Sequence, residues 1–202
     1  MTPGPKKSFD IEEAVLTARD LFWERGYDGT GIRDLETAIG IGRKSLYDTF
    51  GSKRELYIRS LHKYADTVIA RICDGLDREG ATPMVNLERV LGKLQKHHGT
   101  EGSLGCMLGV AMGQIDQGDD ELAALLRGVL ESMERAFERC LRLAQAAGEI
   151  RVDLNPKDTA RQLVALSQGM ALLGRVVDGP TRSRSTIRAA LAAGPGCLHA
   201  GM

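Results

Sequence analysis

Residues 26–57, GYDGTGIRDLETAIGIGRKSLYDTFGSKRELY, contain the pattern that decides the fold of this 202-residue chain. Apolar residues four positions apart predict one short helix over 32–39 and another over 43–50. Gly40 lies between them and can supply the left-handed backbone that a tight turn between helices needs. The stretch therefore predicts two short helices that pack against each other across a glycine-centred turn.

The second of these helices carries a polar outward face. If Leu46 and Phe50 point inward, the residues left outside are Arg43, Lys44, Ser45, Tyr47, Asp48 and Thr49. A short helix with such a face after a glycine turn is what a helix-turn-helix uses to enter the DNA major groove. The pattern alone also fits a surface helical hairpin in any all-α domain.

The same stretch resembles the N-terminal DNA-binding domain of the tetracycline repressor (TetR) family of bacterial regulators. The matching residues span about residues 8–60 and are Ala18, Leu21, Phe22, Gly26, Tyr27, Thr30, Ile32, Asp34, Leu35, Gly40, Ile41, Ser45, Leu46, Tyr47, Phe50, Gly51, Ser52, Lys53, Glu55, Leu56 and Tyr57. The resemblance implies an all-α fold, with a three-helix DNA-binding domain joined by a long helix to a helical ligand-binding and dimerisation domain.

The resemblance and the outward face together predict the residues that contact DNA. Arg43, Lys44 and Ser45 lie at the start of the second short helix and are expected to read base edges. Thr30, Tyr47 and Lys53 match positions that bind phosphate in the family. Asp48 and Thr49 share the outward face. Asp48 is out of place so close to phosphates, unless it accepts a hydrogen bond from a cytosine amino group or stays back in water.

Three residues depart from the family pattern. Gly31 and Gly42 stand where these helices usually begin with Ser or Thr, so both helix N-termini lose a side-chain acceptor. Glu36 replaces a small residue that lets the two short helices approach each other. Its aliphatic part can lie along the packing surface while the carboxylate reaches water.

Charge is distributed unevenly along the chain. The formal net charge is zero, with 27 basic and 27 acidic residues. Between Gly40 and Lys63, however, six basic residues stand against two acidic ones, a local charge of +4. This excess lies where phosphates would be expected, and it suits a protein that binds DNA at a specific site.

The composition gives little indication of a membrane protein, a secreted protein, a metal-binding protein or an enzyme. The longest apolar runs fall short of the ~20 residues that span a bilayer, and the first residues lack the apolar core of a secretory signal. Four scattered cysteines fit a reduced cytoplasm better than a disulfide framework or zinc site. The four histidines form no catalytic or metal-binding motif, so we expect no enzyme activity, no cofactor and no metal.

The predicted domains are a flexible arm over 1–8, the DNA-binding domain over 9–55, a helical domain over 56–194 and a disordered tail over 195–202. A first helix is expected over 10–25, and a long one starts near Ser52. The buried face of this long helix is expected to carry Tyr57, Leu61, Tyr64, Ala65, Val68 and Ile72. Further helices are predicted over 84–98, 106–115, 119–147, 156–177 and 182–193.

The helix over 156–177 is apolar on more than one side, which predicts burial on two faces. With the helix over 182–193 it could form half of a four-helix homodimer interface, and the resemblance points to the same two helices. A monomeric core helix is the alternative. A two-fold dimer would bind a palindromic operator, with its reading helices about 34–36 Å apart.

The second domain is expected to bind an unknown small-molecule effector that releases the repressor from its operator. Candidate pocket residues are Cys106, Met107, Met112, Met133, Phe137 and Met170, with Gln114, Gln162 and Gln168 as polar partners. A helical protein-interaction adapter is one alternative function. Another is a thiol-based sensor acting through Cys106, whose position at a helix start favours the thiolate and beside which Gly105 would leave space. Against that, Cys106 begins an apolar stretch and free cysteines are commonly buried, so inert packing is the alternative for this residue.

Overall fold

The computed structural model describes residues 9–100 and 102–176, and the chain folds into two compact units, Met1–Asp66 and Thr67–Met202. The predicted arm over 1–8, the helix over 182–193 and the tail over 195–202 lie outside the described residues. All regular structure that the described residues form is helical, so the predicted all-α class is confirmed.

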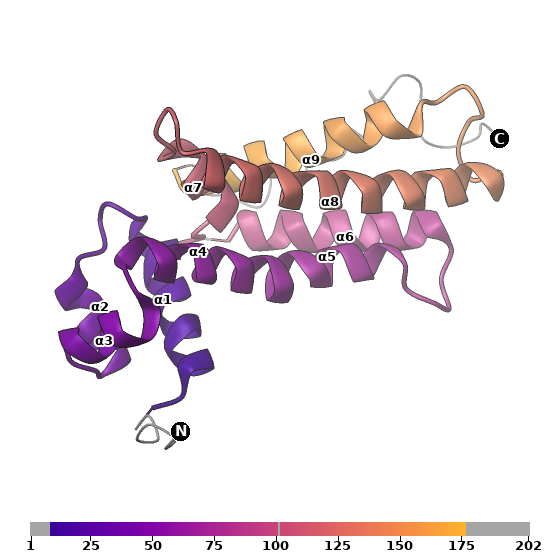
Figure 1. The fold of residues 1–202 in the computed structure, drawn as a ribbon. Coiled ribbons are helices and arrows are strands. Elements are labelled where there is room, and N and C mark those ends of the chain that lie inside the picture. The colour runs from indigo at the N-terminus through magenta and orange to yellow at the C-terminus, as the bar shows by residue number, and fades with distance from the viewer. Residues whose placement is uncertain (1–8, 101, 177–202) are drawn as a thin grey trace, which may run out of the picture. The chain divides into compact units, whose positions relative to one another are not determined.

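The first unit contains four helices, α1 (Ile11–Arg25), α2 (Ile32–Ile39), α3 (Arg43–Phe50) and α4 (Lys53–Tyr64) (Figure 1). The two short helices have the predicted bounds. Side chains define where the other two begin: Asp10 accepts hydrogen bonds from the backbone N–H groups of Glu12 and Glu13, and Ser52 accepts one from Glu55. These caps satisfy donors that a helix N-terminus leaves without intrahelical partners.

The core of the first unit lies between α4 and α1, which pack on each other. Helix α2 packs on α1, and α3 packs on α2 and α4. The largest fully buried side chains of this core include Phe22, Leu35, Leu46, Phe50, Leu56 and Leu61. The ring of Phe22 meets that of Tyr57 edge to face at 5.0 Å, a favourable aromatic geometry. Because α4 packs on α1, the first unit extends through Asp66, beyond the predicted boundary at residue 55.

The chain stays helical after α4 but changes its winding. A π-helical turn, η1 (Ala65–Ile69), connects α4 to α5 (Ala70–Leu76). The wider turn advances the phase of the helix, so Ile69 and Leu76 become buried while Val68 and Ile72 are only half-buried. The buried face predicted for this helix is therefore wrong beyond Tyr64, because it assumed regular α-helical spacing throughout.

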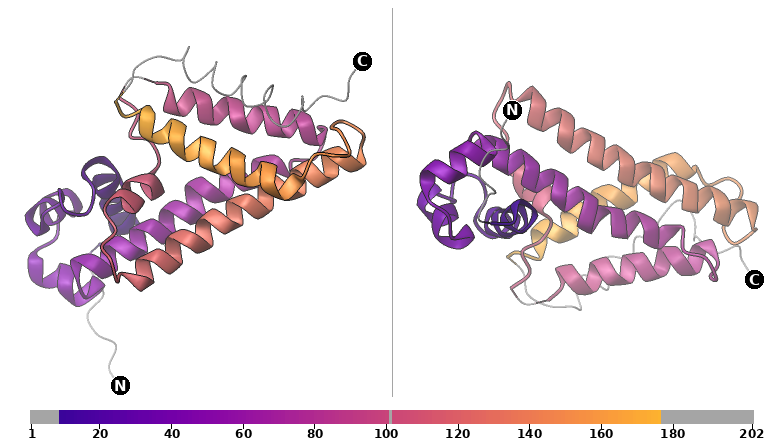
Figure 2. Two further views of the ribbon diagram at one scale, coloured as in Figure 1. Left: turned by 90° about the horizontal axis from the view of Figure 1, so that it is seen from above. Right: turned by 60° about the horizontal axis from the view of Figure 1, so that its bottom comes forward.

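The second unit consists of α5 with α6 (Pro83–His98), α7 (Met107–Gly113), α8 (Asp120–Ala146) and α9 (Pro156–Leu173). Helix α8 packs on α6 and on α9, α5 lies against α6 and α8, and α7 packs on α9 (Figures 1 and 2). The fully buried side chains of this core include Leu87, Leu91, Phe137 and Leu141. In the described residues, no helix is both long and apolar enough to cross a membrane.

Helices α7 and α9 end two or more residues earlier than predicted, and α8 ends one residue early, at Ala146. Helix α7 stops at Gly113 instead of Ile115, where the N–H of Gln114 bonds to Ala111 in a tighter turn. Helix α9 stops at Leu173, and the following residues form similar turn bonds up to Val176. Apolar residues at helical spacing continue past the C-terminal ends of α7 and α9, and for this reason the lengths predicted for these helices were too great.

Candidate nucleic-acid interface

The turn between α2 and α3 has the backbone conformation that the sequence predicts. Gly40 adopts φ 76° and ψ 27°, in the left-handed region, and its N–H bonds to Glu36 O at 2.9 Å. The N–H of Ile41 bonds to the same carbonyl at 3.2 Å. Leu35 and Leu46 are fully buried on either side of the turn. These contacts hold α3 at a defined angle to α2, with its other face free for binding.

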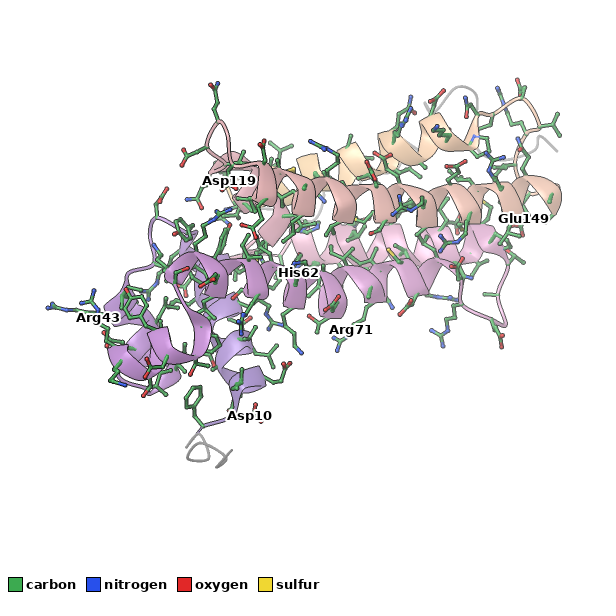
Figure 3. All side chains as sticks on the ribbon, in the orientation of Figure 1. Asp10, Arg43, His62, Arg71, Asp119 and Glu149 are labelled. Carbon is green, nitrogen blue, oxygen red and sulfur yellow. The ribbon has the colours of Figure 1, made fainter. Side chains whose placement is uncertain are left out.

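That other face of α3 is polar and exposed. The residues Arg43, Lys44, Ser45, Tyr47 and Asp48 are exposed, and Thr49 is half-buried. Figure 3 shows the Arg43 side chain extending away from the ribbon. The structure therefore places side by side, on one short helix, six of the eight residues that were predicted to contact DNA.

The exposed residues of α3 interact in pairs one turn apart. The Arg43 guanidinium lies 5.8 Å from the centre of the Tyr47 ring, within cation–π range. The Lys44 amine donates a hydrogen bond to Asp48 Oδ2 at 2.7 Å. This bond to the Asp48 carboxylate raises the pKa of Lys44, so Lys44 is cationic at neutral pH. Asp48, which seemed out of place beside phosphates, is thus paired with a cation.

Lys53 begins α4 and lies over an aromatic ring. Its amine is 4.1 Å from the centre of the Tyr27 ring, and the lysine is half-buried. Burial lowers the pKa of Lys53, and the charge of Asp28 opposes that effect. The contact with Tyr27 was not predicted, because no local pattern connects a residue after α1 with one at the start of α4.

Thr30 does not fit the phosphate-binding role that the resemblance implied. Its side chain is fully buried, and its hydroxyl donates to Gly26 O at 2.7 Å. This bond closes the loop between α1 and α2 and leaves no exposed hydroxyl for a phosphate. The Thr30 side chain is therefore structural in this conformation.

The side-chain hydrogen bond at the start of α2 is made by a residue inside the helix and not by the N-cap residue. Gly31 has no side chain to cap the helix, but its N–H donates to Asp34 Oδ2 at 2.7 Å. The other oxygen of Asp34 lies 3.6 Å from Arg25. Asp34 thus fixes the first turn of α2 and connects it to the end of α1.

The predicted effector residues lie inside the second unit. Cys106, Met107, Met133, Phe137 and Met170 are buried, and Met112 is half-buried. They come from α7, α8 and α9 and their flanks. Whether they line one pocket stays a prediction. Gln114 and Gln162 are exposed, which does not fit the polar role suggested for them in such a pocket.

Among the described residues of the second unit, three buried side-chain polar atoms have no hydrogen-bond partner. They are His98 Nδ1, at the end of α6, Arg151 Nε, in the loop after α8, and Gln168 Oε1, on α9. Burial, together with the charge of the neighbouring His97, lowers the pKa of His98 to about 4. His98 is therefore a neutral imidazole at neutral pH, and no local sequence pattern indicated its burial.

Cys106 is the N-cap of α7, so the predicted start of that helix at Cys106 is one residue early. The residue is buried, with 5% of its surface exposed. A Cβ atom at Gly105 would lie 2.4 Å from Ala171 O, so the space expected beside Cys106 at Gly105 is filled by α9. The structure thus offers no support for the approach route of an electrophile at Gly105.

In the described residues, no group of three or more His, Cys, Asp or Glu side chains is arranged to hold a metal ion. The exposed, partly cationic face of α3, held by a glycine turn against a compact three-helix support, is the arrangement that fits DNA.

Comparison with known proteins agrees with both units. Residues 15–59 match the family model of bacterial regulatory proteins of the tetR family, and residues 87–190 match the model of the tetracyclin repressor-like C-terminal domain. The HTH-type transcriptional regulator YezE of Bacillus subtilis is 31% identical over 77% of this chain and 78% of its own length. The HTH-type transcriptional repressor DhaR of a Mycobacterium species is 26% identical over 80% of each chain.

Solved structures show the same fold. The TetR family transcriptional regulator CifR, a cysteine mutant in complex with 26-bp double-strand operator DNA, superposes with a TM-score of 0.83. The match covers 95% of this chain and 100% of CifR at 23% identity. The reduced form of Escherichia coli NemR superposes with a TM-score of 0.78 at 16% identity, over 94% of this chain and 97% of NemR.

Proposed function

The chain belongs to the tetR family of bacterial regulatory proteins, and from this premise we propose that it is a homodimeric repressor with a small-molecule effector. Each subunit inserts α3 into the major groove of one half of a palindromic operator. The effector binds the helical second unit and lowers the affinity for DNA.

The exposed face of α3 is the observation that carries the DNA-binding part of this proposal. Arg43, Lys44 and Ser45 occupy its first turn, where recognition helices contact base edges. Arginine and lysine donors there match the acceptors N7 and O6 of guanine. Tyr47, on the next turn of α3, and Lys53, at the start of α4, supply groups that can bind phosphate.

The homodimer is supported by exposed apolar side chains near the end of α9. Leu172 is 48% exposed, Leu173 is 55% exposed and Val176 is 84% exposed. Contiguous exposed apolar residues mark interaction sites on otherwise soluble surfaces. A second copy of the chain is the natural occupant, because a two-fold axis is what a palindromic operator requires.

Effector control is a proposal about free energy. A small molecule can release DNA only if it binds the DNA-free arrangement more tightly than the DNA-bound one. The coupling is reciprocal, so operator DNA must weaken effector binding by the same factor. DhaR carries the name of a repressor, which favours repression over activation for this chain.

A mobility-shift titration of the full chain with the DNA upstream of its own gene tests the proposal. We expect saturable binding that weakens steeply as salt rises, because cations released from phosphates drive association. A dimer should be seen by sedimentation at micromolar concentration. A monomer that binds a single half-site tightly would contradict the dimeric operator complex, and absence of DNA binding would favour the adapter alternative.

A further inference from the structure

The ion pair between Lys44 and Asp48 is poorly explained as a device that stabilises α3. Isolated helices gain most when the acidic residue precedes the basic one by four positions. The pairs Glu131–Arg135 and Glu138–Arg142 of α8 follow that order. In α3 the order is reversed, so the cation lies toward the positive end of the helix dipole and the anion toward its negative end.

Asp48 is equally unfavourable as a simple surface charge at a DNA interface. Its side chain is 61% exposed on the face that carries Arg43 and Ser45. A carboxylate there is repelled by phosphates and by most of the major-groove edge, since guanine N7 and O6, adenine N7 and thymine O4 are all acceptors. Donors on that edge are the amino groups of cytosine N4 and adenine N6. If the Asp48 carboxylate contacts a base edge, only these two amino groups can donate to it.

The paired charges match the edge of a single base pair. In a C·G pair, the N4 donor of cytosine lies beside the O6 acceptor of guanine, at a hydrogen-bond distance of about 2.7–3.2 Å. Lys44 Nζ and Asp48 Oδ2 are 2.7 Å apart. At this spacing, Asp48 can accept from cytosine N4 while Lys44 donates to guanine O6, and the ion pair between them stays intact.

An A·T pair offers a similar donor and acceptor, adenine N6 and thymine O4, but its outer atoms differ. In C·G, the additional acceptor N7 lies on the guanine side, next to Lys44. In A·T, the additional acceptor N7 lies on the adenine side, next to Asp48, and the thymine methyl group faces Lys44. The outer atoms thus favour C·G over A·T. The reversed pairs, G·C and T·A, would place an acceptor, guanine O6 or thymine O4, opposite the Asp48 carboxylate.

We propose that Lys44 and Asp48 act as one preassembled unit that reads a single C·G base pair in each half of the operator. Asp48 accepts from cytosine N4, and Lys44 donates to guanine O6 or N7. The proposal rests on the DNA-binding function argued above. It makes Asp48 a residue that determines specificity, since it excludes wrong pairs more than it adds affinity.

Selection of bound duplexes from a randomised pool, followed by sequencing, tests this proposal with the full-length protein. Wild type should enrich a palindrome with a C·G pair at one position per half-site. Asp48→Ala and Lys44→Ala should each lower discrimination at that same position by about tenfold and leave the rest of the palindrome intact. Asp48→Ala should also bind duplexes with another base pair at that position more tightly, because it removes a carboxylate that faces their acceptors.

Asp20→Ala is the matched control. Asp20 lies on α1, its side chain is 60% exposed and it is paired with Arg19 at 2.6 Å, so its replacement removes an equally exposed, ion-paired carboxylate away from α3. We expect no change in base preference. Equal loss of C·G preference in Asp20→Ala and Asp48→Ala would overturn the proposal.

A charge-swapped variant, Lys44→Asp with Asp48→Lys, separates reading from helix stability. It places the pair in the order that favours the helix, so thermal unfolding should occur at the same or a higher temperature. The C·G preference should nevertheless disappear. Retention of that preference in the swapped or single variants would overturn the proposal while leaving DNA binding intact. A wild-type protein that enriches no sequence would instead refute the DNA-binding function, and the base-pair assignment with it.

Discussion

The Lys53 amine lies 4.1 Å from the centre of the Tyr27 ring, so the first residue of α4 is held over the residue that follows α1 and its C-cap. The Tyr27 ring is itself 5.0 Å from that of Tyr57, within the aromatic cluster of the first unit. A flexible lysine loses side-chain freedom when it binds phosphate, and a ring that already orients it reduces that loss.

Tyr27 should therefore matter for DNA affinity although it need not contact DNA. We expect Lys53→Ala to weaken binding to every duplex alike and to reduce the slope of affinity against salt by about one charge. Tyr27→Leu should weaken binding but keep the slope, because Lys53 remains charged. Tyr27→Phe, which retains the ring face, should bind like wild type. Equal affinities for Tyr27→Leu and wild type across a salt series would refute this role.

Arg43 should act differently from Lys53. Replacing Arg43 with Ala should cost about 1–3 kcal/mol of operator binding and relax the preference at one base position. Its partner Tyr47 keeps the guanidinium near the helix, so Tyr47→Phe should preserve that preference. Competition titrations with single-base operator variants would show both effects. An Arg43→Ala protein that is weakened equally on all variants would mean that Arg43 binds phosphate instead.

Leu173 offers a test of the homodimer. Leu173→Glu should dissociate the dimer, because it places a charge in a surface that must lose water on association. Leu143→Glu on α8 is a matched control, since Leu143 and Leu173 are both 55% exposed. We expect that control to remain dimeric in sedimentation equilibrium. Dimers of equal strength in both variants would place the interface away from the end of α9.

Two glycines with left-handed backbone should respond differently to alanine. Gly40 and Gly105 have φ 76° and 70°, so alanine is strained at both, by about 1–2 kcal/mol. At Gly40 nothing lies within 4 Å of the added Cβ, whereas at Gly105 the carbonyl oxygen of Ala171 would lie 2.4 Å from it. Gly105→Ala should therefore lower the free energy of unfolding clearly more than Gly40→Ala in urea titrations. Equal losses would show that α7 and α9 can move apart without cost.

His98 should make stability depend on pH. Its pKa falls from 6.5 in the unfolded chain to about 4 in the folded one, so the unfolded state binds the proton more readily. The stabilising contribution is complete above pH 6.5 and is lost as pH falls toward 4, by about 3 kcal/mol in total. His98→Gln should flatten the dependence of the unfolding free energy on pH over this range. Identical pH profiles for wild type and His98→Gln would contradict the buried neutral imidazole.

Local sequence determined the helix-turn-helix of this protein, α2, α3 and the turn between them. Leu35, Gly40 and Leu46 specify two short helices and the turn between them, because helical spacing and a left-handed glycine depend only on near neighbours. The bounds of α2 and α3 followed from this pattern, as did the outward position of Arg43 and Lys44. The all-α class had the same origin.

Only the tertiary structure decided which of these residues are available and what they touch. Thr30 turned inward to bond Gly26, and Tyr27 came to lie under Lys53, since both contacts depend on how the loop after α1 folds back. The π-turn at Ala65–Ile69 changed which apolar residues are buried. Gly105 met a carbonyl of α9 instead of open space. These outcomes depend on close packing between segments distant in sequence, which no local periodicity encodes.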